Sequence, residues 1–283
     1  DYDAFVLGEV WHIILAFLTK ENLKLKHADL AFLQAKKELI KHLRANHIVA
    51  LAKNKEGLKD KTYYIDFYQR EYVWSDETVK TLLDDIFEVF EQSYFPVKDA
   101  EMTPDVMEKF SWYYMNVFIT NKINNKIYIV DGQQRLSTLT LIGLKLYKMT
   151  PIIQRKNLLL SCICGQDYFE GEVYCIDNKK RKRAMDSLLH DTDFVQPYLN
   201  QTEQTIIERY SYISSYFDKK NLDNKQLEAF IYYFLNKLVL VELSIDNQDD
   251  TAMVFEVIND RGEDLKPFEI LKGKLIGALN KVD

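Results

Sequence analysis

The sequence predicts a mixed α+β protein, in which a small mixed sheet is surrounded by many helices. Segments such as 76–90 repeat apolar residues every three or four positions, as amphipathic helices do. Shorter runs such as 112–119 and 126–130 are rich in β-branched and aromatic residues, which favours strands. Apolar residues make up 47% of the 283 positions, which is enough for a sizeable core.

The composition argues against several classes of protein. The 37 basic and 43 acidic residues give a net charge of −6, which argues against a uniformly basic nucleic-acid coat but leaves a local basic cleft open. The most apolar run, 5–18, is short and contains Glu9 and His12, so we expect a buried helix there and no membrane span. Since no secretory signal is visible either, we expect a cytoplasmic protein.

Three cysteines, Cys162, Cys164 and Cys175, stand close together in the sequence. An odd number without a secretory signal indicates reduced thiols. The three could hold a zinc ion, but no fourth ligand is evident. Three buried or half-buried thiols are therefore the simpler interpretation.

The first elements are read from changes in pattern along the chain. Helical segments cover about 4–45, and a charged connector follows at 53–61. Residues 62–74, TYYIDFYQREYVW, have strand character with a polar interruption. Ser75 is suited to cap a helix, because acidic residues and then an apolar stripe with helical spacing follow it.

The later elements begin with a hairpin, in which the strands 112–119 and 126–130 are joined by the polar residues 120–125. A helix is expected over 136–149, ended by Pro151, whereas 152–178 match neither pattern. The remaining expected elements are a strand at 239–245 and helices at about 184–191, 203–218, 224–237, 249–258 and 266–279. The basic run KKRKR, 179–183, is of a kind that usually forms a solvated face, although contact with nucleic acid stays open.

The stretch DGQQR, residues 131–135, stands between an apolar strand-like run and a helix. The start of a helix presents free N–H groups and the positive end of its dipole, so it attracts anions. Gly132 permits a positive φ or a close approach of the backbone. Arg135 can grip phosphate oxygens with its planar fork.

The other polar residues of this stretch admit several roles. Gln133 and Gln134 can donate and accept hydrogen bonds, which suits a base, a sugar or an attacking water. Asp131 could hold a metal, orient water or pair with Arg135. A purely structural interpretation is equally open, in which Asp131 caps the helix and the amides are solvated. The stretch is no P-loop, because GxxxxGK[ST] does not occur in the sequence.

Two further stretches combine polar and apolar residues in a similar way. FYQREYVW, 67–74, places Gln69 and Arg70 inside an aromatic segment, where a buried arginine needs an anion or an internal acid as partner. FEVINDRGEDLKPFEILKGKL, 255–275, contains a tight turn and several positive charges. The three stretches could converge on one anion.

In their order and sequences, YQREYVW, IVDGQQRLSTL and FEVINDRGEDLKPFEILK resemble the domain-of-unknown-function family 262. This is the GmrS-like N-terminal domain of modification-dependent (type IV) restriction systems and other phage-defence proteins. The resemblance covers about residues 62–279. It implies a DGQQR nucleotide-binding domain over 61–283, with a helical insertion or subdomain at about 150–238. Residues 1–60 lie outside the resemblance, and their pattern predicts a helical N-terminal extension.

The resemblance also implies a ParB/sulfiredoxin-like core, in which a loop at a helix start binds phosphate. It implies binding and hydrolysis of a nucleoside triphosphate, GTP or ATP, usually with Mg²⁺. By position, the expected catalytic residues are Asp131, Gln133, Gln134 and Arg135. The expected nucleotide-binding residues are Gln69, Arg70, Gly132, Asn259, Arg261, Gly262 and Lys272.

The family is coupled to the recognition or cutting of modified phage DNA, so we expect DNA as a partner. We expect the nuclease, of HNH type, to lie outside these residues, because none of the five histidines has the proline that an H-x-x-P motif requires. His190, for example, is followed by Asp-Thr-Asp. The alternative is a non-catalytic sensor of nucleotide or DNA that signals to a nuclease partner. A homo-oligomer stays open.

Overall fold

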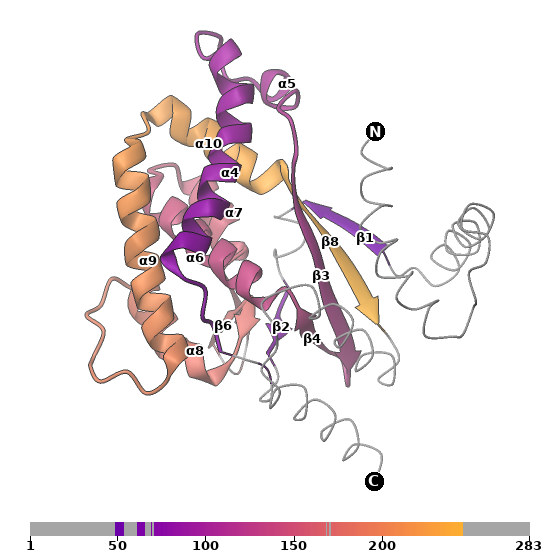
Figure 1. Ribbon diagram of the computed structural model, residues 1–283, viewed down its shortest axis with the longest axis vertical. Coiled ribbons are helices and arrows are strands. Elements are labelled where there is room, and N and C mark those ends of the chain that lie inside the picture. The colour runs from indigo at the N-terminus through magenta and orange to yellow at the C-terminus, as the bar shows by residue number, and fades with distance from the viewer. Residues whose placement is uncertain are drawn as a thin grey trace, which may run out of the picture. The chain divides into compact units, whose positions relative to one another are not determined.

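The computed structural model describes residues 49–53, 61–65, 69, 71–167, 169 and 171–245 (Figure 1). Residues 51–242 form one compact unit. The helices expected over 4–45, 249–258 and 266–279 lie outside the described residues. Within these limits the protein is a mixed α+β protein, as the sequence predicts. The ParB/sulfiredoxin-like topology stays a prediction.

Six strands form the larger sheet, in the order β1-β8-β3-β4-β2-β7. β2 lies parallel to both β4 and β7, whereas β3 and β4 are antiparallel, so the sheet is mixed. A separate two-stranded hairpin pairs β5 with β6. The strand bounds are β1 Val49–Lys53, β2 Tyr63–Tyr64, β3 Tyr113–Ile123, β4 Lys126–Asp131, β5 Cys164–Asp167, β6 Gly171–Tyr174, β7 Ile176–Asp177 and β8 Leu238–Ile245.

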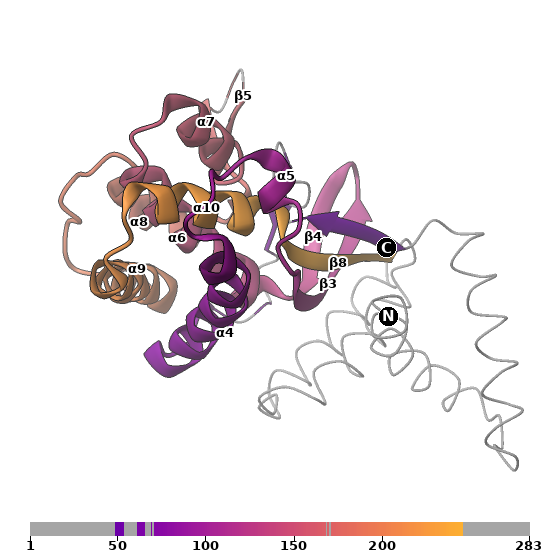
Figure 2. The same cartoon turned by 90° about the horizontal axis from the view of Figure 1, so that it is seen from above.

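The helices of the compact unit lie on one side of the strands in both views (Figures 1 and 2). Among them, α6 is buried on most of its faces, so it forms the centre of the helical layer. The α-helix bounds are α4 Asp76–Tyr94, α5 Pro104–Met107, α6 Gln133–Met149, α7 Ile153–Ser161, α8 Lys179–Leu189, α9 Gln201–Lys220 and α10 Asn224–Asn236, and a short 3-10 helix, η1, covers Phe95–Val97. None of the helices in the described part of the chain combines the length and the apolarity needed to cross a bilayer.

Aromatic rings hold α4, α9 and α10 together. Phe87 of α4 stacks on Phe230 of α10 with ring centroids 4.3 Å apart, and Phe217 of α9 meets Phe87 edge-on at 5.5 Å. Phe90, one turn after Phe87, meets the same Phe230 ring edge-on at 5.1 Å. All four rings are fully or almost fully buried. Offset and edge-on pairs are favourable beyond the area they bury, so this cluster contributes strongly to the core.

The hairpin of β3 and β4 is tighter than the sequence suggests. The polar residues Thr120 and Asn121, expected in the turn, belong to β3 and are buried. The turn consists of Asn124 and Asn125, which have φ of 48° and 64°. Two successive positive φ values are typical of the type I′ turn, which matches the twist of paired strands. Polarity alone therefore misplaced the end of the strand by four residues.

The strand expected over 62–74 is mostly absent. Of the described residues in that range, only Tyr63 and Tyr64 form a strand, and 71–74 have no regular secondary structure. The β-branched and aromatic composition indicated burial correctly at Tyr63 and Tyr72. It did not indicate how the backbone groups of 71–73 are satisfied, which depends on side chains of α6 and α9.

The predicted cysteine environment is confirmed. Cys162, Cys164 and Cys175 form no disulfide with one another, and all three are buried. Burial raises the pKa of the Cys164 thiol to about 11, so it stays protonated near neutral pH. Within the described residues, no group of three or more metal-binding side chains is close enough to hold a metal ion.

The predicted cap of α4 is also confirmed. Ser75 has extended backbone angles, and its Oγ accepts a hydrogen bond from the Thr78 N–H at 3.3 Å. We expect Ser75→Ala to lower the free energy of unfolding by about 1 kcal/mol, because one N–H of the first turn loses its partner. Urea denaturation measures this change. Ser75→Asp, which restores a capping oxygen, should retain most of the stability, and equal losses in both variants would contradict the role of the cap.

Candidate functional site

The junction of β4 and α6 places Gly132 where only glycine fits. Gly132 is the N-cap residue of α6 and has φ +91°. A Cβ on Gly132 would lie 2.6 Å from the Phe118 Cβ of the neighbouring strand, which is too close for any side chain. The chain therefore turns from strand to helix in direct contact with β3, and the first turn of α6 stands at the end of the sheet.

The N-terminus of α6 differs from those of α4, α8, α9 and α10, and resembles that of α7 in having no side-chain cap. Side chains of Ser75, Asn178, Asn200 and Asp223 cap α4, α8, α9 and α10. The N-terminus of α6 has no side-chain cap, because its N-cap residue is a glycine. Its first turn thus keeps the positive end of the helix dipole without an acceptor from a capping side chain.

Gln134 fastens the irregular segment 71–73 to α6. Its Nε2 donates to the Glu71 carbonyl at 2.7 Å, and its Oε1 accepts from the Val73 N–H at 2.9 Å. The two bonds imitate those of a neighbouring strand. Gln134 is only 5% exposed, so both ends of its amide are committed to the backbone.

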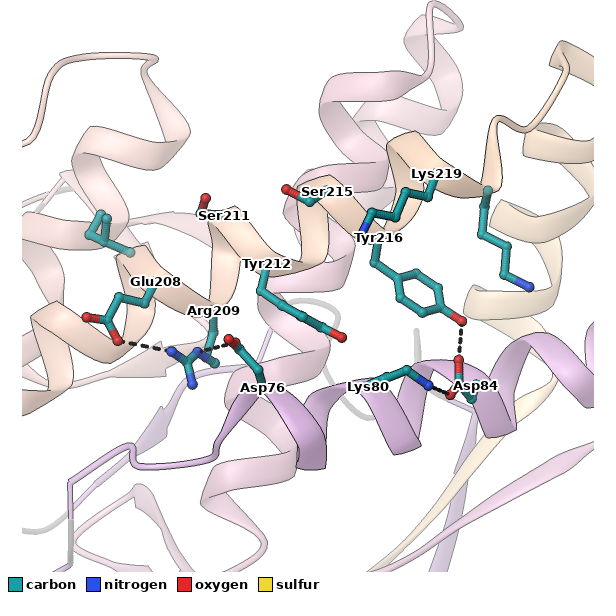
Figure 3. A pocket seen from close by; sticks show the side chains of 12 residues that line it. Asp76, Lys80, Asp84, Glu208, Arg209, Ser211, Tyr212, Ser215, Tyr216 and Lys219 are labelled. Carbon is teal, nitrogen blue, oxygen red and sulfur yellow. Dashed lines mark hydrogen bonds and ion pairs between the residues drawn. The ribbon is translucent and has the colours of Figure 1, made fainter.

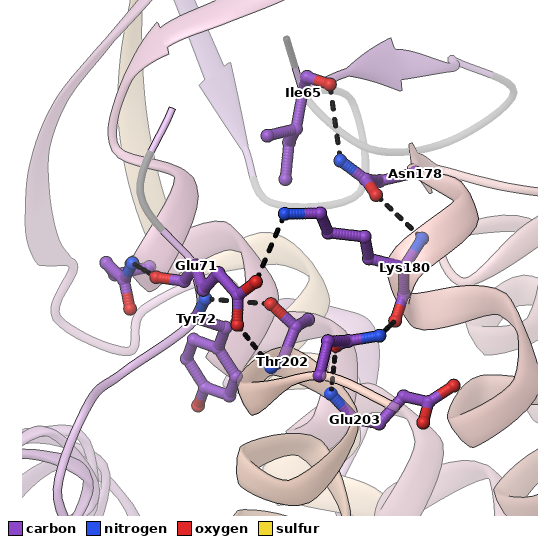
Figure 4. Close-up of polar contacts among 9 residues, drawn as sticks. Ile65, Glu71, Tyr72, Asn178, Lys180, Thr202 and Glu203 are labelled. Carbon is purple, nitrogen blue, oxygen red and sulfur yellow. Dashed lines mark hydrogen bonds and ion pairs between the residues drawn. The ribbon is translucent and has the colours of Figure 1, made fainter. Parts of the chain in front are cut away.

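The segment 71–73 is held from two further helices (Figure 4). The Tyr72 N–H donates to Thr202 Oγ1 at 3.2 Å, and the Glu71 carboxylate accepts from the Thr202 N–H at 3.0 Å. Lys180 of α8 reaches the other carboxylate oxygen of Glu71 at 3.1 Å. The side chains of α6, α8 and α9 therefore meet at this one segment.

Arg135 lies close to the junction. Its Nη1 is 3.9 Å from the position that a Cβ on Gly132 would occupy, so the side chain folds back toward the start of its own helix. Burial lowers the pKa of the Arg135 guanidinium, and the nearby Asp131 carboxylate acts in the opposite direction. Since an arginine stays charged at neutral pH, the protein keeps a desolvated positive charge beside the N-terminus of α6.

Gln69 also belongs to this group of residues. Its Nε2 donates to the carbonyls of Ile129 and Val130, the latter at 3.4 Å, near the end of β4. Its Oε1 is buried and has no hydrogen-bond partner among the described residues. The structure thus brings Gln69 to the DGQQR stretch, although the two are separated by about 60 positions.

The expected site residues divide into two sets. Asp131, Gly132, Gln133, Gln134, Arg135 and Gln69 gather at the start of α6. Arg70, Asn259, Arg261, Gly262 and Lys272 lie outside the described residues, so their convergence on the same anion stays a prediction.

Only part of the basic run 179–183 forms the solvated face that the sequence suggests, because Lys179, Lys180 and Lys182 are exposed whereas Arg181 is not. The run forms the first turn of α8, and Arg181 is only 4% exposed. Lys180 pairs with Glu71, and Arg183 pairs with the buried Glu203 at 3.1 Å. Lys182 contacts Asp186 at 3.6 Å. Three of the five cations therefore pair with acids of the protein, which leaves less charge for a nucleic acid.

Sequence reasoning missed Arg181, although a signal for its burial is present. The apolar positions of α8 include Ala184, Met185 and Leu189, and Leu188 packs against the core. Counting back three and four residues from Ala184 and Met185 leads to Arg181, which therefore shares the buried stripe of the helix. The four neighbouring basic residues concealed this spacing.

A separate pocket lies between α4 and α9, away from the DGQQR stretch (Figure 3). Its volume is about 940 Å³, and charged and tyrosine side chains line it. These groups bind one another: Asp84 accepts from Lys80 and from Tyr216, and Arg209 contacts Asp76 at 3.1 Å. Because the polar groups are already paired, the pocket offers less for a charged ligand than the start of α6 does.

Comparison with protein families gave a match over residues 49–276 to the family described as GmrSD restriction endonuclease, N-terminal domain. Comparison with curated proteins gave no match. The family match covers most of the chain and includes all three stretches that carried the resemblance. The chain therefore belongs to the GmrSD N-terminal-domain family, and it is a domain of a restriction or phage-defence protein.

Proposed function

We propose that this domain binds a nucleoside triphosphate, GTP or ATP, at the start of α6 and hydrolyses it. In this way it would gate a nuclease that acts on modified phage DNA and is carried by another segment or chain. The observation that carries the proposal is the N-terminus of α6, which has no side-chain cap and lies beside the desolvated positive charge of Arg135. Membership of a restriction-endonuclease family supports DNA and a nuclease as partners.

The residues present fit a phosphate chain. Gly132 lets the backbone approach a ligand closely, and the N–H groups of the first helical turn point toward that side. Arg135 supplies a planar fork for phosphate oxygens, and its partial burial strengthens any such contact. Gln133, at the first position of α6, would orient a water toward the reacting phosphorus in this proposal.

The DGQQR stretch offers fewer ligands for Mg²⁺ than for phosphate. Asp131 is the carboxylate of the DGQQR stretch, and protein-bound Mg²⁺ is commonly held by one or two carboxylates together with phosphate oxygens and water. Asp131 would supply that single ligand. When bound, Mg²⁺ would neutralise charge on the phosphates, while Arg135 would stabilise the charge that develops in the transition state.

Gln134 takes a different role in this proposal from the one its position in the motif suggests. Both ends of its amide bind the backbone of 71–73. It is therefore a positioning residue, which holds Glu71 and Tyr72 beside the site. Gln133 and Arg135 remain as the side chains of α6 that would act on the phosphates.

The test is phosphate release from each common nucleoside triphosphate by the purified chain with Mg²⁺. We expect Arg135→Ala to reduce the rate by about 100-fold or more, because a charge-stabilising group is lost at the reacting centre. Arg155→Ala is the matched control, since Arg155 binds Glu228 away from the site and its loss should leave the rate unchanged. Circular dichroism should show the same fold for both variants.

Two outcomes would count against hydrolysis. If the wild-type chain releases no phosphate from any triphosphate and also shows no binding by calorimetry, the proposed site is wrong. If calorimetry shows tight binding without product, the domain is a nucleotide sensor that signals to its nuclease without turnover.

A further inference from the structure

Arg181 is a buried cation without a matching anion. The residue is 4% exposed, and its Nη2 donates to Ser137 Oγ at 2.7 Å. Its Nε has no hydrogen-bond partner among the residues that the structure describes. No described carboxylate lies within ion-pair distance of this side chain. Buried arginines are normally paired, so the missing partner requires an explanation.

A small cavity lies against Arg181, with a volume of about 30 Å³. It is lined by residues from the first two turns of α6 and the first turns of α8 and α9, among them Gln133, Ser137, Lys180 and Thr202. The space is enough for about two waters, or for the oxygens of one tetrahedral oxyanion. The cavity is too small for a whole nucleotide.

The electrostatics of the cavity favour an anion. Burial lowers the pKa of the Arg181 guanidinium to about 10, only partly opposed by Tyr72 and Asp177, so the charged form is less favoured there than in water. Glu71 also lines the cavity, but its two oxygens already bind Lys180 Nζ and the Thr202 N–H. An oxyanion beside Arg181 would therefore offset part of the free-energy cost of burying the Arg181 charge.

The same cavity connects Arg181 to the DGQQR stretch. Ser137 Oγ accepts from Arg181 and donates to the Gln133 carbonyl at 2.6 Å. Gln133, Gln134 and Gln69 line the cavity from the other side. A group held by Arg181 would thus lie next to the start of α6, where the nucleotide is proposed to bind.

We propose that Arg181 and the surrounding cavity form an oxyanion subsite, which takes one phosphate group, the terminal phosphate of the bound nucleotide. This deepens the proposed function and rests on it for the identity of the ligand. The presence of the subsite itself rests on the unpaired Nε, the burial of Arg181 and the cavity. Because Arg181 comes from α8, the phosphate would join α8 to α6.

The first test uses inorganic phosphate and the melting temperature. Phosphate should raise the melting temperature of the wild-type chain above that in sodium chloride of equal ionic strength. Arg181→Met, which keeps the bulk but removes the charge, should lose this increase and should be as stable as wild type without phosphate. Lys179→Met is the matched control, since it removes an exposed charge from the same run and should keep the increase.

The outcomes separate an anion from other contents of the cavity. An equal rise in Arg181→Met would mean a general salt effect, and no rise in the wild type would mean that the cavity holds only water. Either result would overturn the subsite. If Arg181→Met does not fold, Arg181→Lys replaces it. A lysine cannot reach both Ser137 and an oxyanion with a planar fork, so phosphate should bind at least about tenfold more weakly.

The second test distinguishes the subsite from the nucleotide site. By calorimetry with Mg²⁺, Arg181→Met should weaken triphosphate binding by about tenfold or more and diphosphate binding much less. If the wild type binds phosphate but no nucleotide, the proposed function fails while the subsite stands. If wild type and Arg181→Met bind triphosphate equally, the subsite fails while the proposed function stands.

Discussion

Gly132→Ala should lower the free energy of unfolding by about 2–5 kcal/mol. A side chain at φ +91° costs about 1–2 kcal/mol, and the contact with the Phe118 Cβ at 2.6 Å forces β3 and α6 apart at a further cost of about 1–3 kcal/mol. Urea denaturation followed by circular dichroism measures the change. Because the same movement displaces the first turn of α6, ligand binding there should fall as well.

Two other glycines separate the causes of this loss. Gly171 has φ +73° but no atom within 4 Å of an added Cβ, so Gly171→Ala should show the backbone cost alone, about 1–2 kcal/mol. Gly165 has neither a positive φ nor a near neighbour, so Gly165→Ala should change stability by less than about 0.5 kcal/mol. If Gly132→Ala is no worse than Gly171→Ala, then the contact with Phe118 does not constrain the junction.

Gln134→Leu should lower the free energy of unfolding by about 2–3 kcal/mol. The leucine fills most of the space of the amide but leaves the Glu71 carbonyl and the Val73 N–H without partners, and each unsatisfied buried group costs about 1–3 kcal/mol. The half-exposed Val73 can recover water, which keeps the total at the lower end. Gln92→Leu is the control, because the Gln92 amide bonds only to the exposed Glu88 one turn away.

The pH dependence of Gln134→Glu tests the same bonds in another way. A protonated glutamic acid can donate to the Glu71 carbonyl and accept from the Val73 N–H, as the amide does, whereas a carboxylate cannot donate. The folded protein should therefore raise the pKa of this side chain above its unfolded value of about 4.3. The variant should be closest to wild type below that pH and should lose stability as pH rises. A pH-independent difference would contradict the double hydrogen bond.

Much of the helical layer can be predicted from local patterns. α4 follows from the Ser75 cap and the apolar spacing after it, and α6 follows from the apolar run that ends before Pro151. These signals are contained in the helix itself, since caps and amphipathic stripes act over a few residues. The strand ends are harder, because the burial of Thr120 and Asn121 depends on neighbours distant in sequence.

The candidate site could be predicted only in part, for a related reason. DGQQR identified the start of α6, because a glycine and polar residues between a strand and a helix have a local meaning. The role of Gln134 depends on a backbone segment some 60 positions earlier, and the burial of Arg181 depends on how α8 packs. Neither dependence is visible within the motif, and a run of five basic residues gives no sign that one of them, Arg181, is buried.

The segment 71–73 has a consequence for following the site by experiment. Its Val73 and Tyr72 amide protons are held by side chains, Gln134 and Thr202, and not by a strand of the sheet. Their exchange with solvent deuterium therefore reports whether the hydrogen bonds from Gln134 of α6 and Thr202 of α9 to this segment remain intact. α4 begins shortly after this segment, at Asp76. Slower exchange at these two amides when ligand is added would therefore show that the ligand stabilises the first turn of α6 and the start of α4 together.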